Sequence, residues 1–429
     1  MSSAPDVVVV GGGAIGAASA YELARRGARV TVLERSGDAS GCSFGNAGLI
    51  CPSHAEALAN PAAVRDGLAW IARRDSPFRL RLRPGLLPWL ARFGVAALPR
   101  RSARATAELQ TLARASLERH AELDREGLET GFARRGTLSV YESADAFERA
   151  RDSVTRRAVP GASESPAAAR PLSATEAREL EPALAAGVAG ALHHPGDAHC
   201  DPGALVRALL RGAREHGADV RMRVELLRLR RTDRRVAGLD TTAGPIAAET
   251  VVLAAGTWSQ SLARAAGVHV PLEPAKGYHV ELPAGSLAGG IPVYMEEARV
   301  IATPLDGRLR LAGTLELAGH DMGVDPVRVA SLTRAAARTL TLPAGARTLH
   351  VWRGLRPCTP DGLPVIGRAP GVENLVLATG HAMLGITLAP ATGELVADLV
   401  SGAPPRHALE PFRPGRFRGR LREGGRWQP

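Results

Sequence analysis

The 429-residue sequence predicts an α/β protein in which a doubly wound domain with a parallel sheet is interrupted by a second, α+β domain. Residues 6–34 are typical of a buried strand, a glycine-rich turn, a helix and a second strand. Residues 276–315 alternate apolar and polar side chains in short runs, which predicts an antiparallel sheet. Segments of the first kind return near residues 190–270 and 355–410, so we expect the first domain to be discontinuous.

The overall composition is that of a soluble globular protein, with 45% hydrophobic and 23% charged residues. No apolar run reaches the ~18 residues that a membrane-spanning helix needs, and the N-terminus lacks the pattern of a secretory signal. The four cysteines have no CxxC spacing, which disfavours a disulfide framework or a four-cysteine zinc site. These features predict a cytoplasmic protein.

The charge is strongly basic, at +11, and Lys276 is the only lysine. Residues 65–104 hold ten arginines against two aspartates, and the tail at 411–429 is also arginine-rich. Such a balance suits nucleic acid, an anionic membrane surface or simply a solvated surface. We expect no nucleic-acid partner because no recognised nucleic-acid motif appears, although a non-catalytic nucleic-acid-binding protein is a distant alternative.

The most specific motif is the glycine-rich turn after the first strand. Gly11, Gly13 and Gly16 form G-x-G-x-x-G at the start of a helix, and Glu34 ends the next strand. The glycines permit a tight turn, close approach of a pyrophosphate and close packing of helix on strand, while the helix N-terminus favours phosphate. A carboxylate at Glu34 can accept hydrogen bonds from ribose hydroxyls. The motif therefore predicts a dinucleotide site, without separating FAD from NAD.

A loop at residues 36–54, "SGDASGCSFGNAGLICPSH", follows this motif directly. Its small and polar residues suit wrapping a second part of a cofactor, such as a flavin, and loops of this length usually have a function. His193, His194, His199 and Cys200 lie close together in the sequence, and such residues can bind a metal. We expect no metal site, because adjacent strand residues alternate sides and no HxxxH or CxxC spacing occurs.

These patterns divide the chain into two interleaved domains and a tail. We expect a dinucleotide-binding domain at 1–55, 190–270 and 355–410, a substrate domain at 56–189 and 271–354, and a basic tail at 411–429.

Several of these segments together resemble one family: "VVVVGGGAIGAASAYELARRGARVTVLER", "SFGNAGLICPS", "PAKGYHVEL", "WRGLRPCTPDGLPVIG" and "NLVLATGHAMLGITLAPATGELVADLV". They resemble the D-amino-acid oxidase-like superfamily of FAD-dependent oxidoreductases, whose FAD domain is of the glutathione-reductase (Rossmann-like) type. The likeness is closest to the bacterial D-amino-acid dehydrogenase branch and more distant to glycine oxidase and sarcosine oxidase. Cys42 departs from it, since threonine or serine is usual there.

The resemblance implies a non-covalent FAD and a set of residues that contact it. The adenosine and pyrophosphate side would include Gly11, Gly13, Ala14, Ile15, Gly16, Glu34, Arg35, Val224, Ala254, Gly256 and Trp258. The flavin side would include Ser43, Asn46, Ala47, Gly48, Leu49, Gly380, His381, Met383, Gly385, Ile386 and Thr387. A helix that begins near Ile386 would point its positive end at the flavin N1 region.

The resemblance also implies oxidative deamination of a D-amino acid to a 2-oxo acid and ammonia, with hydride transfer to flavin N5. Arg356 matches the family's anchor for the substrate carboxylate, a role that suits the bidentate guanidinium. Tyr278, Tyr294 and Arg299 are further candidates to frame the substrate, and Lys276 is a candidate amine beside flavin or substrate. His381 is also a candidate to frame the substrate.

Some alternatives stay open at this point. The electron acceptor is expected to be a quinone or another acceptor, and the donor could instead be glycine, sarcosine or a cyclic D-imino acid such as a D-proline derivative. The segment "AWIARRDSPFRLRLRPGLLPWLARFG", at residues 69–94, interleaves aromatic residues with arginines. It suits either a peripheral contact with anionic membrane or packing on the substrate domain.

Overall fold

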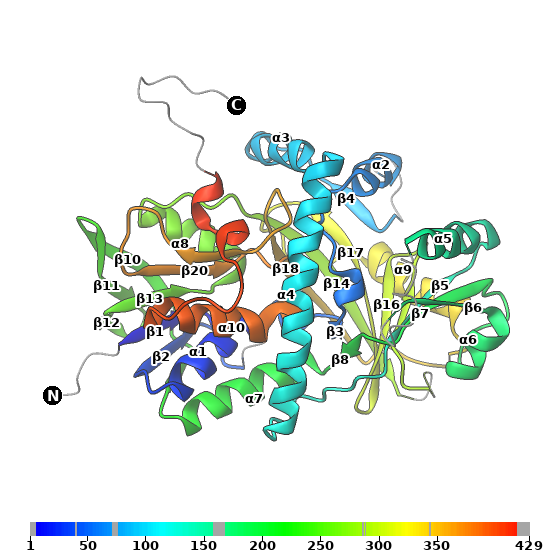
Figure 1. Cartoon of the computed structure of the whole chain (residues 1–429), viewed down its shortest axis with the longest axis horizontal. Helices are drawn as coiled ribbons and strands as arrows, with labels where there is room; N and C mark the ends of the chain where they lie inside the picture. Colours follow the sequence, from blue (N-terminus) through cyan, green and yellow to red (C-terminus); the bar gives the residue numbers. More distant parts are fainter. Residues whose placement is uncertain are drawn as a thin grey trace.

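The computed structural model describes residues 6–38, 41–70, 76–157, 168–284, 287, 289–342 and 345–417. Two sheets organise this part of the chain, and the long helix α4 (Pro99–Arg125) runs between them in the view of Figure 1. None of the described helices is both long and apolar enough to cross a membrane. The predicted basic tail lies outside the described residues from 418 onward, as do residues 71–75 of the arginine-rich segment.

The first sheet is formed by the glycine-motif strands and by segments far away in sequence. Its strands are β1 (Val7–Val10), β2 (Val30–Glu34), β9 (Asp219–Met222), β13 (Thr250–Leu253), β19 (Val365–Arg368) and β20 (Leu375–Thr379). The order is β19-β20-β13-β1-β2-β9, and all neighbours are parallel except β19 and β20. The four valines of β1 are all buried, as expected for a central parallel strand covered on both faces.

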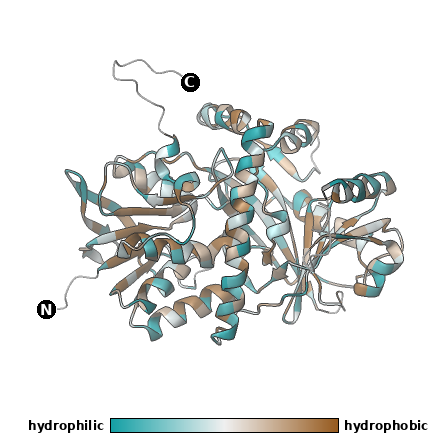
Figure 2. Cartoon of the chain, viewed as in Figure 1, coloured by the Kyte–Doolittle hydropathy of each residue, from teal (hydrophilic) through white to brown (hydrophobic). Residues whose placement is uncertain are grey.

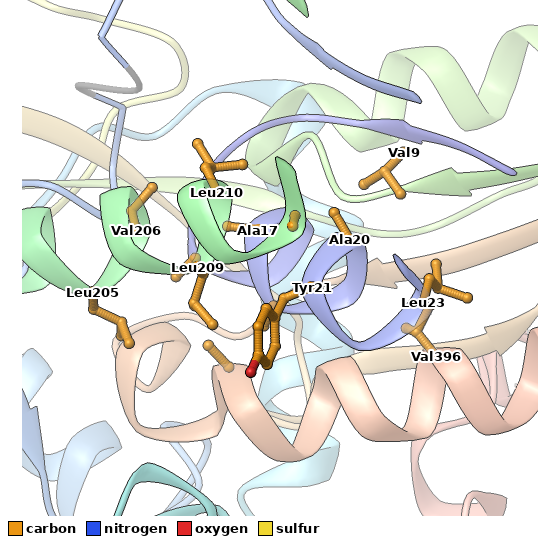
Figure 3. Close-up of a cluster of buried hydrophobic side chains, with 14 of the residues drawn as sticks. Val9, Ala17, Ala20, Tyr21, Leu23, Leu205, Val206, Leu209, Leu210 and Val396 are labelled. Carbon is orange, nitrogen blue, oxygen red and sulfur yellow. The ribbon is translucent and has the colours of Figure 1, made fainter. Parts of the chain in front are cut away.

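Helices α1 (Ala14–Arg25), α7 (Pro202–Glu215) and α10 (Gly385–Ser401) cover one face of this sheet. Figure 3 shows Tyr21 of α1, Leu209 of α7 and Val396 of α10 in one buried cluster. Small residues let α1 and α10 approach closely, since a Cβ on Gly393 would lie 2.6 Å from the Ala18 carbonyl oxygen. This contact holds the beginnings of both helices beside the same edge of the sheet.

A three-stranded meander and a short helix accompany the first sheet. The meander consists of β10 (Leu226–Thr232), β11 (Arg235–Thr241) and β12 (Gly244–Ile246), and the helix is α8 (Ser259–Ala265). Together they cover the other face with a second apolar cluster.

The second sheet contains nine strands among the described residues. They are β4 (Phe78–Leu80), β5 (Thr137–Tyr141), β6 (Arg170–Ser173), β7 (Gly190–His194), β14 (Glu273–Pro283), β15 (Val293–Met295), β16 (Val300–Leu305), β17 (Arg308–Leu317) and β18 (His350–Cys358). The order is β18-β14-β17-β16-β15-β5-β7-β6, with β4 beside β17. The predicted antiparallel strands within 276–315 are present, but the sheet is mixed because β15 pairs with β5, and β4 with β17, in parallel.

The remaining elements cover this sheet or join the two. Helix α9 (Pro326–Thr339) packs on one face through an apolar cluster. The others are α2 (Pro61–Trp70), α3 (Leu87–Ala96), α5 (Ala144–Arg157), α6 (Ala174–Leu180) and the ribbon of β3 (Leu49–Ile50) with β8 (Ala198–His199). In Figure 2 the brown, hydrophobic segments concentrate in the strands of both sheets and in the helix faces against them.

Strand pairing corrects two of the expected domain boundaries. We expected residues 190–270 in the first domain, but β7 pairs with β5 and β6 in the second sheet. We also expected a boundary at 355, but β18 continues along β14 as far as Cys358. The pairing partner of a strand decides its sheet, and composition alone does not show that partner.

Candidate active site

A cavity of about 410 Å³ lies at the carboxyl ends of β1, β2 and β13, where ligands bind in open α/β sheets. Many residues predicted from the sequence line it: Gly11, Gly13, Ala14, Ile15, Glu34, Arg35, Ser43, Asn46, Val224, Ala254, Gly256, Trp258, His381, Gly385 and Ile386. The geometry therefore brings together segments that are up to 375 residues apart in the sequence.

Two glycines of the motif have no room for a side chain. Gly11 has a φ of +105°, and a Cβ there would lie 2.6 Å from the Ala254 carbonyl oxygen. A Cβ on Gly16 would lie 1.8 Å from the Gly11 carbonyl oxygen. Gly13 differs, because its φ is −70° and its nearest neighbour would be Ser43 Oγ at 3.1 Å. Gly13 thus keeps open the cavity beside the N-terminus of α1.

Glu34 is held at the end of β2 by neighbouring donors. Its Oε2 accepts the Gly12 N–H at 2.7 Å, and its Oε1 accepts the Ser36 N–H at 2.8 Å and the Ser36 hydroxyl at 2.7 Å. Nearby, the Arg35 guanidinium stacks 3.6 Å from the centre of the Trp258 ring, a cation–π contact between two cavity-lining residues.

The loop after β2 crosses the cavity with its polar side chains fixed. Ser43 Oγ accepts the Ala14 N–H at 2.9 Å. This N–H lies in the first turn of α1 and so has no partner within the helix. Asn46 Oδ1 accepts the Gly48 N–H at 2.8 Å, while Asn46 Nδ2 donates to the Met383 carbonyl at 3.0 Å. Ser43 and Asn46 thus tie the loop to the residues at the beginnings of α1 and α10.

The beginning of α10 faces the same cavity through Gly385 and Ile386, so its positive end is directed there. His381 Nε2 lies 3.0 Å from Thr392 Oγ1, whereas its buried Nδ1 has no partner among the described residues. Burial lowers the pKa of His381 to about 3, so the ring is neutral.

Seven predicted cofactor residues do not line the cavity: Gly16, Ala47, Gly48, Leu49, Gly380, Met383 and Thr387. Several support the wall; for example, the Thr387 hydroxyl donates to the Leu49 carbonyl at 2.9 Å. The sequence interpretation missed lining residues such as Cys42, Leu355, Pro357 and Thr379. Only their proximity to predicted residues in the sequence gave any signal of them.

Arg356 lies on β18 with its guanidinium over the neighbouring strand. A Cβ on Gly277 would lie 2.2 Å from Arg356 Nη2, and Nη1 donates to the Thr314 carbonyl at 2.7 Å. Its charge acts on the thiol of Cys42, which lines the cavity. Burial lowers the pKa of Arg356, yet it has no carboxylate partner within the part of the chain that the structure describes. A half-buried guanidinium without a carboxylate partner can take an anion.

Lys276 and Tyr278, the other candidates on β14, are not brought together with Arg356. They alternate with Gly277 on β14 and so point to the opposite face of the sheet. There Lys276 Nζ lies 3.3 Å from Glu316 and 3.2 Å from Asp321. The Tyr278 ring is buried in the cluster beneath α9. Both residues belong to an ion-paired, packed layer.

Tyr294 and Arg299 lie further along the second sheet. Neighbouring strands are ~4.8 Å apart, so four steps place β15 about 19 Å from β18. Arg299 Nη1 donates to the Tyr294 hydroxyl at 3.3 Å and pairs with Glu296 at 3.0 Å. Strand order thus separates Tyr294 from β18, whereas Arg299 lies in the turn before β16, with its carbonyl oxygen 3.0 Å from the position of a Cβ on Gly313. Gly313 precedes Thr314, whose carbonyl accepts from Arg356.

A polar cluster around His54, which the sequence interpretation missed, joins the loop to this end of the sheet. His54 Nε2 lies 3.0 Å from Ser139 Oγ and 3.9 Å from Glu296, and its ring centre is 5.4 Å from that of Tyr294. Asp197 lies 3.8 Å from His54 Nδ1. Burial opposes protonation, but the Asp197 and Glu296 carboxylates outweigh it and raise the pKa of His54 to about 9.

The comparisons with known proteins agree with this geometry. The model of the FAD dependent oxidoreductase family, DAO, matches residues 6–399. The chain belongs to this family. It is 37% identical to a D-amino acid dehydrogenase of Paramagnetospirillum magneticum, over 96% of this chain and 98% of the relative. It is 38% identical to D-amino acid dehydrogenase 2 of Ralstonia nicotianae, over 95% of this chain and 99% of the relative.

Solved structures of this fold include glycine oxidase from Geobacillus kaustophilus, which is 29% identical with a TM-score of 0.74 and covers 97% of this chain and 99% of its own. L-proline dehydrogenase from P. horikoshii shares the fold, with 22% identity and a TM-score of 0.73. The match covers 97% of this chain and 98% of that one. The protein is thus an FAD-dependent oxidoreductase, and the cavity described above, with its glycine cradle and helix N-termini, fits FAD.

We expect Gly13→Ala to weaken FAD binding at least about tenfold, because its Cβ would enter the cavity while the backbone at φ −70° accepts alanine. Gly94→Ala is the matched control, since that glycine has no neighbour within 4 Å of an added Cβ. Fluorescence titration of apoprotein with FAD measures both. Equal FAD affinity in the two variants would contradict this assignment.

We expect His54 to stabilise the folded state in a pH-dependent way. Its folded pKa of about 9 exceeds the ordinary value of 6.5, so the contribution is complete below pH ~6.5 and is lost as the pH rises through ~9. The difference in Tm between the wild type and His54→Gln should therefore shrink between pH 7 and pH 10. A difference that stays constant over this range would show that His54 is not held as an imidazolium.

Proposed function

We propose that the protein oxidises a D-amino acid to its 2-oxo acid and ammonia, using non-covalent FAD and passing the electrons to a quinone or another acceptor. The observation that carries this proposal is Arg356, a half-buried guanidinium without a carboxylate partner among the described residues, on the strand whose Leu355 and Pro357 line the FAD cavity. Its fork suits the carboxylate that every α-amino acid presents. The similarity to proteins named D-amino acid dehydrogenase supports the choice of stereoisomer.

In the proposed reaction the protein orients the substrate, and the cofactor accepts the electrons. FAD, when bound, supplies the acceptor for the hydride that leaves the substrate α-carbon. Arg356 would fix the substrate carboxylate, so that the α-carbon is presented in one orientation. The positive end of α10 would stabilise negative charge on that side of the cavity. Water then hydrolyses the imine product to the 2-oxo acid and ammonia, which balances the reaction.

The cysteines near the cavity support a non-covalent cofactor. Burial raises the pKa of Cys42 to about 11 and that of Cys358 to about 12, so both are thiols and poor nucleophiles at neutral pH. We propose that neither is attached to the flavin. Acid-precipitated protein should accordingly be colourless, with the flavin in the supernatant.

We propose that the two sheets are the cores of an FAD-binding and a substrate-binding domain, with β18 crossing from one to the other. The main alternative donor is glycine, sarcosine or a cyclic D-imino acid, and the similarity to glycine oxidase supports keeping it. These donors share the carboxylate that Arg356 would hold. They differ in their side chains and in the substitution of the amine. Tyr294 and Arg299 would lie only at the outer end of the surface that faces these groups.

We further propose that the α2–α3 surface contacts anionic membrane, where a quinone would be reached. In this surface the exposed fraction is 70% for Leu68, 67% for Leu82 and 57% for Leu87. Arginines accompany them at 65, 79, 81, 83 and 92. Figure 1 shows α2, β4 and α3 together at the upper edge of the molecule. Exposed leucines with arginines suit the interface of an anionic bilayer.

Substitution of Arg356 by leucine tests the proposed carboxylate anchor. We expect Arg356→Leu to retain FAD while the KM for the preferred D-amino acid rises on the order of 100-fold or more, because a charge-assisted bidentate contact is lost. The KM of Arg356→Lys should lie between those of the wild type and Arg356→Leu, because lysine keeps the charge but cannot make the bidentate contact. Anaerobic bleaching of the flavin by a panel of D- and L-amino acids, glycine, sarcosine and D-proline measures this.

Two outcomes of that experiment would contradict the proposal. Loss of FAD together with substrate binding would make Arg356 a structural residue. Bleaching of the wild type by L-amino acids alone would overturn the proposed stereochemistry.

The membrane contact predicts that full-length holoenzyme sediments with phosphatidylglycerol-containing vesicles at low salt and less so at moderate salt. Leu82→Glu should reduce sedimentation, because it places a carboxylate at the centre of the surface. Leu349→Glu serves as the control, because Leu349 is 50% exposed, precedes β18 and neither belongs to this surface nor lines the cavity. The proposed membrane contact would be refuted if sedimentation did not depend on anionic lipid, or if both variants reduced it equally.

A further inference from the structure

We propose that Arg310 is a positioning residue that holds the cavity-lining loop at residues 43–46 and thereby sets the environment of the flavin. The loop's position relative to the flavin rests on the proposed function; the contacts themselves do not. Arg310 lies on β17 and is fully buried, and it does not line the cavity. Any effect on the cofactor must therefore pass through the loop.

The Arg310 guanidinium joins three groups at once. Its Nη1 donates to the Phe44 carbonyl at 2.8 Å and to the Asn46 carbonyl at 2.7 Å. On its other side, Glu281 Oε1 accepts from Nε at 3.1 Å and from Nη2 at 2.7 Å. The planar fork makes these contacts simultaneously, which the single ammonium group of lysine cannot do.

Two further residues of the second sheet hold the glycine between Phe44 and Asn46. His279 Nδ1 lies 3.1 Å from the Gly45 carbonyl, and the Trp352 ring stacks on the His279 ring with centres 5.2 Å apart. A carbonyl only accepts, so His279 donates from Nδ1. A Cβ on Gly45 would lie 2.2 Å from the Trp352 ring, so the loop already touches that ring. Three successive carbonyls thus contact side chains of one sheet.

The opposite side of the loop faces the cavity, so the contacts of Arg310 with the loop can affect the cofactor site. Ser43 bonds the first turn of α1, Asn46 bonds the Met383 carbonyl before α10, and both line the cavity. A shift of the carbonyls of residues 44–46 would displace these two side chains. Arg310 therefore acts on the cofactor's surroundings while its own atoms stay behind the loop.

The charges around Arg310 argue for an ion-paired clamp and against a metal site. His279, Glu281 and His350 are the one group with metal-ligand spacing in the described ranges. Glu281 already receives Arg310 and the Arg308 Nε at 3.1 Å, so two guanidinium groups surround its carboxylate. A divalent cation would have to bind beside both of them, which repulsion disfavours.

Arg310→Lys is the direct test, and Arg328→Lys is its matched control. Arg328, on α9, is also buried and pairs with Glu316 at 2.5 Å on the opposite face of the same sheet. We expect both variants to lower the Tm. Only Arg310→Lys should shift the visible absorption spectrum and the reduction potential of the bound flavin, and weaken FAD binding about tenfold. It should also lower kcat more than it raises KM.

Gly45→Ala repeats the test from the other side of the loop without changing a charge. It should shift the flavin spectrum in the same way, because the added Cβ must displace the loop from Trp352, and it answers the question if Arg310→Lys does not fold. Unchanged spectra, potential and FAD affinity per folded protein in these variants would overturn the proposal. The spectra and potential need no amino-acid substrate, so a wild type that oxidises no D-amino acid would refute the proposed function alone.

Discussion

The structure depends above all on the convergence of two helix N-termini on the carboxyl edge of one parallel sheet. Helix α1 follows β1 and α10 follows β20, and the two strands are separated only by β13. Close packing of α1 on α10 through Gly393 fixes both ends beside the cavity. The free N–H groups and aligned dipoles then create a site for anionic cofactor groups before any side chain contributes. The second sheet reaches this edge through β18, whose Leu355 and Pro357 line the cavity.

Much of this first layer could be predicted from the sequence, because its signals are local. The glycine spacing, the valine strand and the acid at Glu34 lie within about thirty residues, and each follows from the backbone geometry it must adopt. The loop at residues 43–46 was also recognisable from its composition and its resemblance to the family. Eight of the fifteen predicted cofactor residues that line the cavity lie in these two stretches, whereas the other seven were implied only by the family resemblance.

The second layer was less predictable, because it depends on which strand pairs with which. Tyr278 and Lys276 were candidates from residue type, yet the alternation of β14 directs them away from Arg356. His54 and Arg310 carried no local signal, since their partners Asp197, Glu296 and Glu281 are brought to them by the fold. Arginine occurs in two settings in the described part of the chain: buried beside a carboxylate at Arg310 and Arg328, and half-buried without one at Arg356. That contrast is why we propose a binding role for Arg356 alone.

The central claim is that Arg356 provides an unpaired cation for a carboxylate beside the flavin. The most direct measurement is a difference-absorbance titration of oxidised holoenzyme with benzoate and with benzamide, which have nearly the same shape but differ in charge. We expect benzoate to cause a saturable shift of the flavin bands and benzamide to bind at least about tenfold more weakly. Equal responses to the two compounds, or none to benzoate, would contradict the assignment of Arg356 as the carboxylate anchor.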